Sequence, residues 1–112
     1  MVRKIETGAE LFCLVRHFAT IALMSVGIYD DNEAHENGKT AHVLTVDGEV
    51  VAFAVMTSRG EVSAIETHQA HQRRGYAAQL VRAIGATSGA LITNEGAARL
   101  FESLDLPYFW QA

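Results

Sequence analysis

Residues 61–84 change in pattern from that of a strand to that of a helix, and this change restricts the fold more than any other feature of the chain. Glu61–Thr67 has the β-branched and apolar content of a strand, and Gly85 ends a helical pattern that begins after Gly75. A strand that leads into an amphipathic helix is typical of an α/β sheet covered by helices. The apolar face of this helix is formed by Ala77, Leu80, Val81 and Ile84.

Two β-rich runs flank Asp47-Gly48 and predict a hairpin upstream of this unit. Asp and Gly both tolerate the positive φ of a type I′ turn, so the dipeptide is a strong short-range hairpin signal. The second run, Val50–Thr57, ends at the turn-forming Ser58-Arg59-Gly60, and the strand Glu61–Thr67 follows. We therefore expect three consecutive antiparallel strands.

The N-terminal third of the chain predicts a strand, a helix and a polar loop. Val2–Glu6 alternates weakly, as a short edge strand does. Thr7 and Glu10 have the spacing of a capping box, which would begin a helix of about five turns that ends near Gly27. Residues 30–39 contain four acids and form either a solvated loop or a rim that attracts a cationic substrate.

A strand, a helix and a last strand are expected in the C-terminal third. Ala90–Thr93 is a short apolar run, and Asn94 can cap the helix after it. Pro107 prevents that helix from continuing, and Tyr108–Ala112 can form a final strand. The resulting order predicts an α/β fold with antiparallel and parallel parts in one sheet. The inner face of the last helix is expected to consist of Ala97, Leu100, Phe101 and Leu104.

Length and charge limit the partners of the chain. Its 112 residues make one domain, 1–112. The net charge of −4 argues against sequence-independent nucleic-acid binding, which needs a basic surface, whereas a local basic cluster suits a small anion. Cys13 is the only cysteine and is expected to be a packed core thiol. The N-terminus lacks a signal-peptide core and polar residues interrupt the apolar segment 11–28, so we expect a cytoplasmic protein that does not enter the membrane.

The turn before the helix 76–84 combines the features of an anion site. A helix N-terminus has unpaired N–H groups and a partial positive charge. Gly75 lets a phosphate approach the backbone, and Ala77 keeps the first helical turn clear. The turn lacks the ending of a Walker loop and the glycine spacing of a dinucleotide fingerprint. Four residues therefore either frame a pyrophosphate or form a solvated basic corner: Gln72, Arg73, Arg74 and Gly75.

The run Gln72-Arg73-Arg74-Gly75-Tyr76-Ala77, between a strand and a helix, resembles the acetyl-CoA-binding motif of the GNAT superfamily of N-acetyltransferases. The hairpin 43–55, the strand 62–67, the helix 76–84 and the late run LFESLDLPYF occur in the order found in that family. The resemblance implies a GNAT-like fold: a mixed, largely antiparallel sheet with flanking helices and a shortened C-terminal part. It also implies transfer of an acetyl group from acetyl-CoA to a primary amine in a ternary complex, without a metal.

The resemblance implies which residues contact the cofactor. In the family the fourth strand splays away from the fifth, and the pantetheine arm enters the gap. Main-chain groups of the fourth strand pair with the pantetheine, and N–H groups at the helix start hold the pyrophosphate. The corresponding residues here are Ile65, Glu66 and Thr67 for the pantetheine; Gln72, Arg73, Arg74, Gly75, Tyr76, Ala77 and Ala78 for the pyrophosphate; and Asn94 and Phe101, with the helix around 97–101, beside the thiol end.

The resemblance further implies a proton acceptor for the amine on the strand 61–67. Glu61 stands at the offset where several relatives carry a base and has the strand parity of Thr67, whereas Glu66 is nearer the thioester but has the other parity. A β-bulge, common in this strand among relatives, would reverse that argument. Either carboxylate can instead be a surface or ion-paired group. Two histidines after the strand either move protons or are polar bystanders: His68 and His71.

The chain departs from the family at three places. Gln69 replaces a frequent proline before the turn. Phe101 stands where relatives often have the tyrosine that acts as general acid, so the thiolate would leave with help from water or Tyr108, or catalysis is weakened. Residues 107–112 provide one strand where relatives have a hairpin, which predicts an incomplete final sheet. The aromatic residues of this segment suit either a homodimer interface or core packing: Tyr108, Phe109 and Trp110.

Three functions are compatible with the sequence. The first is an acyl-CoA-dependent N-acyltransferase whose acceptor is an amine of a small molecule or of a protein. The second is a GNAT-like module that binds acetyl-CoA, has weak or no catalysis and acts through protein contacts. The third is a small α/β domain without a cofactor.

Overall fold

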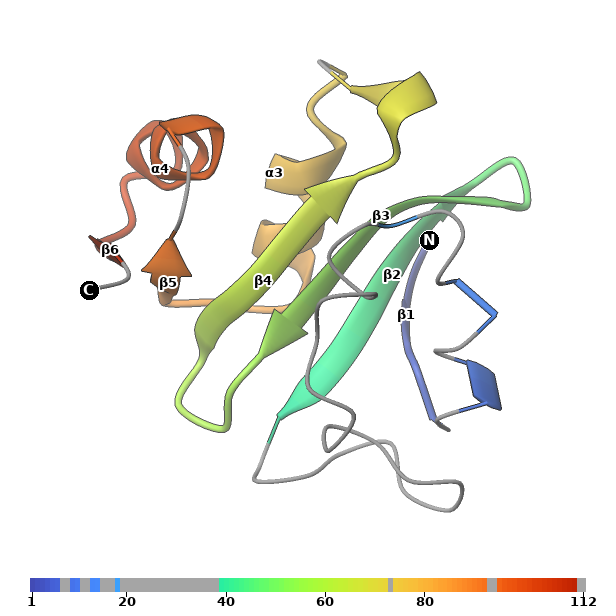
Figure 1. Ribbon diagram of the computed structural model, residues 1–112, viewed down its shortest axis with the longest axis horizontal. Helices are drawn as coiled ribbons and strands as arrows, with labels where there is room; N and C mark the ends of the chain where they lie inside the picture. The colour runs from blue at the N-terminus through green and yellow to red at the C-terminus, as the bar shows by residue number, and fades with distance from the viewer. Residues whose placement is uncertain are drawn as a thin grey trace.

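The computed structural model describes residues 1–6, 9–10, 13–14, 18, 39–72, 74–92 and 95–110, with the backbone alone for residues 69 and 91. Its centre is a six-stranded sheet in which the strands follow their order along the chain, β1-β2-β3-β4-β5-β6 (Figure 1). Neighbouring strands from β1 to β4 are antiparallel, and β5 and β6 continue the sheet in parallel. The elements are β1 (Val2–Lys4), β2 (Thr40–Val46), β3 (Glu49–Met56), β4 (Glu61–Thr67), the 3-10 helix η2 (Gln69–His71), α3 (Tyr76–Ala83), β5 (Ser88–Ile92), α4 (Glu95–Ser103) and β6 (Tyr108–Trp110).

The mixed, largely antiparallel sheet expected from the sequence is confirmed. The hairpin turn has positive φ at both central residues, 52° at Asp47 and 80° at Gly48, as a type I′ turn requires. β4 has the expected bounds, while β5 begins two residues earlier than expected, at Ser88. The expected first helix, the polar loop, Arg73 and Asn94 lie mainly or wholly outside the described residues.

Side chains of the central strands alternate between two cores, because successive residues of a strand point to opposite faces of the sheet. On one face β2 and β3 pack against the N-terminal part of the chain, and on the other they pack against α3. The first core contains Ile5, Phe18, Ala41, Val43, Phe53 and Val55, and the second contains Leu44, Val51, Ala52, Ala54 and Leu80.

The face of α4 that packs against the sheet differs slightly from the face expected from the sequence. Ala98 and Phe101 are its buried residues, whereas Ala97 and Leu100 are half-buried. Ala98 and Phe101 join Val62, Val81 and Ile92 in a third core that connects both helices to β4 and β5. The helical period predicts an apolar stripe, but it does not tell which edge of the stripe faces the strands.

A β-bulge interrupts β4. Val62 pairs with Met56, but Ala64 pairs with the adjacent Val55, so Ser63 is an extra residue in β4. Because of this extra residue, the residues of β4 before the bulge point to the opposite face of the sheet from the one that simple alternation predicts. Because the face occupied by Ala64 belongs to the first core, both Glu61 and Glu66 point to that face. The expected shared parity of Glu61 and Thr67 is therefore wrong.

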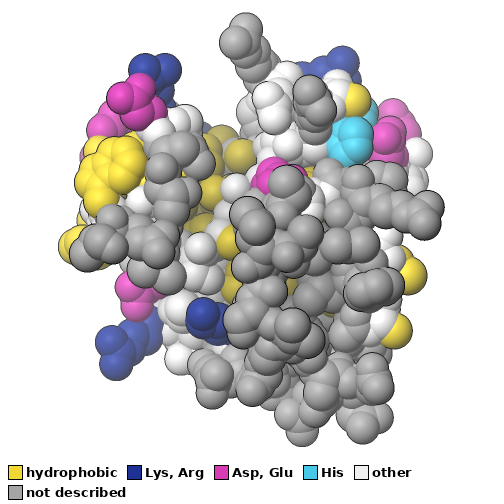
Figure 2. Space-filling view, in the orientation of Figure 1, with side chains coloured by type: hydrophobic (Ala, Val, Ile, Leu, Met, Phe, Trp, Pro, Cys, Tyr) yellow, Lys and Arg dark blue, Asp and Glu magenta, His cyan; other side chains and the backbone are white. Residues whose placement is uncertain are grey.

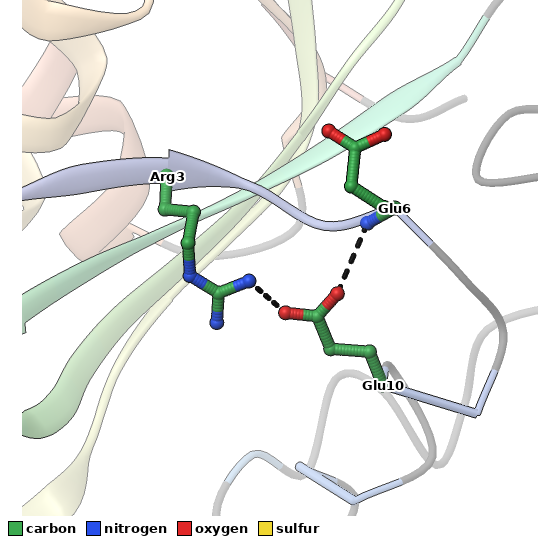
Figure 3. Close-up of polar contacts among 3 residues, drawn as sticks. All are labelled: Arg3, Glu6 and Glu10. Atoms are coloured by element: carbon green, nitrogen blue, oxygen red, sulfur yellow. Dashed lines mark hydrogen bonds and ion pairs between the residues drawn. The ribbon is translucent and has the colours of Figure 1, made fainter.

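The chain beyond β1 is tied back to that strand by Glu10 (Figure 3). One carboxylate oxygen of Glu10 pairs with the guanidinium of Arg3, and the other accepts the backbone N–H of Glu6 at 3.1 Å. In a capping box this acceptor would bond the N–H of the capping residue itself, here Thr7, which lies outside the described residues. Glu10 thus holds β1 against the start of the following segment.

Cys13 was expected to be a core thiol, and this expectation is wrong, because its side chain is exposed. At the other end of the chain, β6 is the single strand expected after α4, and it forms one edge of the sheet. Tyr108 packs on the third core, while Phe109 and Trp110 are 60% and 53% exposed. The homodimer interface expected there stays a prediction.

Gly89 is required by the packing of α4 on β5. A Cβ at Gly89 would lie 2.6 Å from the ring of Phe101, which is fully buried. We expect Gly89→Ala to destabilise the protein by about 2 kcal/mol through overpacking, as measured by urea unfolding. The double variant Gly89→Ala/Phe101→Leu should lose less unfolding free energy than the two single variants lose together, because the smaller leucine side chain removes the clash with the new Cβ. Additive effects would contradict the packing explanation.

Candidate functional site

β4 and β5 are paired over only a short distance. The register joins Glu61 to Ser88 and Val62 to Gly89, and no further pair is found among the described residues. From the bulge at Ser63 onward the two strands diverge, and Figure 1 shows the gap widening toward the C-terminal end of β4. The sheet is therefore open along one side of β4.

A cleft of about 470 Å³ occupies this opening. It lies between the end of β4, the start of α3 and the first half of α4, and Figure 2 shows the hollow between the α4–β6 part and the rest of the molecule. Small side chains on both helices leave room for a ligand against the strand. The lining residues are Ile65, Glu66, Thr67, Gln72, Ala77, Gly96, Ala97 and Leu100.

Alternate residues of β4 direct their main-chain groups into the cleft. The N–H of His68 bonds to the carbonyl of Val51 at 2.8 Å in the ladder with β3. Because hydrogen-bonded and non-hydrogen-bonded pairs alternate in an antiparallel ladder, Glu66 faces β3, and the N–H and C=O groups of Ile65 and Thr67 face away from it. An extended ligand backbone can pair with these groups as a neighbouring strand would.

The first turn of α3 faces the same opening with N–H groups that precede the hydrogen-bond ladder of the helix. Gly75 is the N-cap, with φ +78°, and has no side-chain cap. The first helical bond runs from the N–H of Gln79 to the carbonyl of Gly75 at 3.0 Å, so the N–H groups of Tyr76, Ala77 and Ala78 precede the ladder. Arg74 is exposed beside them, and the first turn contains no acid. This end of the cleft suits an anion.

Five of the twelve residues expected to bind the cofactor are brought together here. Of the expected residues, Ile65, Glu66, Thr67, Gln72 and Ala77 line the cleft. Gln72 also reaches back to the carbonyl of Thr67, at 3.5 Å from its amide nitrogen. Gly96 also lines the cleft, and it was not predicted from the sequence. A small residue after the strand end was the signal that could have identified it.

The two candidate carboxylates are separated along β4. Glu66 lines the cleft, whereas Glu61 is paired with Ser88 where the sheet is closed and is not a lining residue. The five residue steps between them correspond to at most roughly 17 Å of extended chain, and the bulge at Ser63 shortens this distance. Both side chains point to the face opposite α3, but only Glu66 lies at the opening.

Phe101 and Tyr108 are placed away from the lining of the cleft. Phe101 is fully buried in the third core, and the α4 residues that line the cleft are Gly96, Ala97 and Leu100. The hydroxyl of Tyr108 donates to a carboxylate oxygen of Glu102, and this hydrogen bond raises the pKa of Tyr108. Its proton is therefore engaged on the outer side of α4.

Other classes of site are not found in the described part of the chain. It contains no group of three or more His, Cys, Asp or Glu side chains arranged for a metal ion. It also contains no helix with the length and apolarity needed to cross a bilayer.

Solved structures with a similar fold include several acetyltransferases. The ribosomal-protein-S18-alanine N-acetyltransferase of Escherichia coli has a TM-score of 0.58 at 19% identity, over 93% of this chain and 75% of that one. The ribosomal-protein-alanine N-acetyltransferase of Brucella melitensis biovar Abortus 2308 has a TM-score of 0.55 at 14% identity, over 100% and 80% of the two chains. An aminoglycoside acetyltransferase from an uncultured soil metagenomic sample, solved with sisomicin, has a TM-score of 0.52 at 12% identity, over 100% and 76%.

Sequence comparisons identify the family. No curated protein matches the chain significantly. The model of the family described as FR47-like protein matches residues 42–109, which include β3, β4, the turn before α3, the helices α3 and α4, and β5. This match covers more than half of the chain. The protein therefore belongs to the FR47-like family, within the GNAT superfamily of N-acetyltransferases.

Proposed function

We propose that the protein is an acyl-CoA-dependent N-acyltransferase that uses acetyl-CoA and an amine acceptor. The observation that carries the proposal is one cleft in which the edge of β4 that diverges from β5 leads directly to the N-terminus of α3. Such a cleft matches a ligand with an extended amide-containing arm and a pyrophosphate at one end. Bound acetyl-CoA would supply the activated acyl thioester.

The chain offers binding groups for both parts of the cosubstrate. The main-chain groups of Ile65 and Thr67 can hydrogen-bond the amides of the pantetheine arm. The N–H groups at the start of α3 can bind the pyrophosphate, and Arg74 can add a charged donor beside them. Gly96 and Ala97 leave space on the α4 side for the arm. We place Arg73 and Asn94 in the same site on the resemblance alone.

For the reaction, we propose Glu66 as the group that accepts the proton of the attacking amine. Its side chain lines the cleft and points to the face of the sheet opposite α3, so the acceptor would approach from that face. Glu61 is the second candidate, at the closed end of the β4–β5 pair. The N–C bond forms as the C–S bond breaks, and the thiolate takes a proton from water.

A CoA-binding module with weak or no catalysis is the second candidate function. Phe101 cannot donate a proton, and the Tyr108 hydroxyl is bonded to Glu102, so neither of these two residues offers a general acid at the cleft lining. This observation favours slow thiolate departure. The module would then act through a protein partner.

The acceptor is proposed to be a primary amine of a small molecule or of a protein, acted on in the cytoplasm. The similar structures named above include enzymes for ribosomal-protein alanine and for an aminoglycoside. We also keep the homodimer through residues 108–110 as a proposal, because β6 is an edge strand with two exposed aromatic residues.

Release of free CoA thiol tests the proposed function. We expect acetyl-CoA to be consumed only when an amine from a varied panel is present, with one thiol released for each amide formed. Acetyl-CoA at about 100-fold above its Kd should stabilise the folded protein by about 2.7 kcal/mol, visible as a higher Tm. Thermal stabilisation without thiol release for any amine would favour the binding module, and no stabilisation would contradict both functions.

A further inference from the structure

His71 lies next to both ends of the turn that is proposed to bind the anion. His71 is the last residue of η2 and precedes Gln72 directly, and its N–H donates to the carbonyl of His68 at 2.8 Å. Its ring centroid lies 6.2 Å from that of Tyr76, the first residue of α3. The turn between η2 and α3 thus has His71 on one side and Tyr76, the ring partner of His71, on the other.

His71 is in turn held by Glu49, the first residue of β3. The His71 Nε2 lies 3.2 Å from a carboxylate oxygen of Glu49. The His71 side chain is only 17% exposed, and its Nδ1 is buried with no hydrogen-bond partner in the described part of the chain. The contact with Glu49 is therefore the polar interaction that orients the His71 ring. It also connects the β2–β3 hairpin to the turn before α3.

The charge of Glu49 is unfavourable for anion binding taken by itself. A carboxylate close to a pyrophosphate site repels the ligand, so on charge alone the turn would bind an anion better without Glu49. A positioning role predicts the opposite, because a turn held in its binding conformation loses less conformational entropy when the ligand binds. The two effects differ in sign, and this makes them separable by experiment.

We infer that Glu49 and His71 are positioning residues that hold the turn 72–75 in its anion-binding conformation. The inference rests on the proposed function, since the ligand of this turn is the pyrophosphate of CoA. Neither side chain lines the cleft, so both act through the turn and the start of α3.

The test compares four variants by calorimetric titration with CoA. Glu49→Ala should raise the Kd of CoA about fivefold, which is the upper end of the free energy that an exposed ion pair contributes. Glu49→Gln should change the Kd by no more than about twofold, because the amide oxygen still accepts a hydrogen bond from Nε2. His71→Phe keeps a ring against Tyr76 but loses the contact with Glu49. It should weaken CoA binding at least as much as Glu49→Ala, because the repulsive carboxylate of Glu49 remains. The double variant should bind no more weakly than either single one. The kcat at saturating acetyl-CoA should not change.

Glu95→Ala is the matched control, because it removes one acid and an exposed ion pair with Arg99 on α4 without a contact to the turn. It should not weaken CoA binding. Amide hydrogen exchange of residues 74–78 in the ligand-free protein gives a second readout, and it should accelerate in Glu49→Ala but not in Glu95→Ala.

Unchanged or tighter CoA binding by Glu49→Ala, or exchange rates equal to those of the wild type, would overturn the positioning role alone. A wild-type protein that binds no CoA would overturn the proposed function as well. Faster exchange in Glu49→Ala would then still show that the pair holds the turn, which keeps the two failures distinct.

Discussion

The variant Gly75→Val is expected to bind CoA about a hundredfold more weakly than the wild type, a loss of about 2.7 kcal/mol. Gly75 has φ +78° at the N-cap of α3, where a β-branched residue is strained by about 1–3 kcal/mol. Relief of that strain would redirect the N–H groups of the first helical turn. Among the described residues, no atom outside the two chain neighbours of Gly75 lies within 4 Å of a Cβ built there, so the new side chain would fill space that the ligand needs. Titration with CoA measures the effect.

Gly85→Val is the matched control for this experiment. Gly85 follows the other end of α3, has φ +72° and likewise has nothing within 4 Å of a built Cβ. Both variants should lose similar stability in urea unfolding, because both place a Cβ in the left-handed region. Only Gly75→Val should lose CoA affinity. Equal Kd values for the two variants would show that the turn is not the pyrophosphate site.

The second large effect concerns turnover. Glu66→Gln should lower kcat by about a hundredfold and leave the Kd of CoA nearly unchanged, because the amide retains the shape of the carboxylate but cannot accept the amine proton. The measurement is thiol release at saturating acetyl-CoA and amine. A full loss of CoA binding would instead indicate that Glu66 shapes the cleft.

Glu61→Gln decides between the two carboxylates. Glu61 is paired with Ser88 where β4 and β5 are closed, and it does not line the cleft. We therefore expect this variant to retain most of the wild-type kcat. If Glu61→Gln lost turnover and Glu66→Gln retained it, the roles proposed here would be reversed.

The elements were predictable where the chemical signal is local. Asp47-Gly48 specifies its turn through the φ values that these residues tolerate, and the alternation to helical spacing after Gly75 specifies α3. The motif around Gly75 also located one end of the cleft, which Gln72 and Ala77 line.

The catalytic side of the site was less predictable because it depends on non-local pairing. The bulge at Ser63 arises from the register between β3 and β4, and it moves Glu61 to the same face as Glu66. The same limit applies to α4, where contact with Gly89 buries Phe101 and leaves Leu100 at the cleft. No periodicity within α4 contains that information.

The short pairing between β4 and β5 also bears on how the protein unfolds. The segment from β5 to β6 is joined to the rest of the sheet by two residue pairs and by the third core, whereas β2 and β3 share seven pairs. We therefore expect this segment to open at a lower free energy than the meander formed by β2, β3 and β4. A ligand that bridges Thr67 and Gly96 would link this segment to the meander and make them melt together.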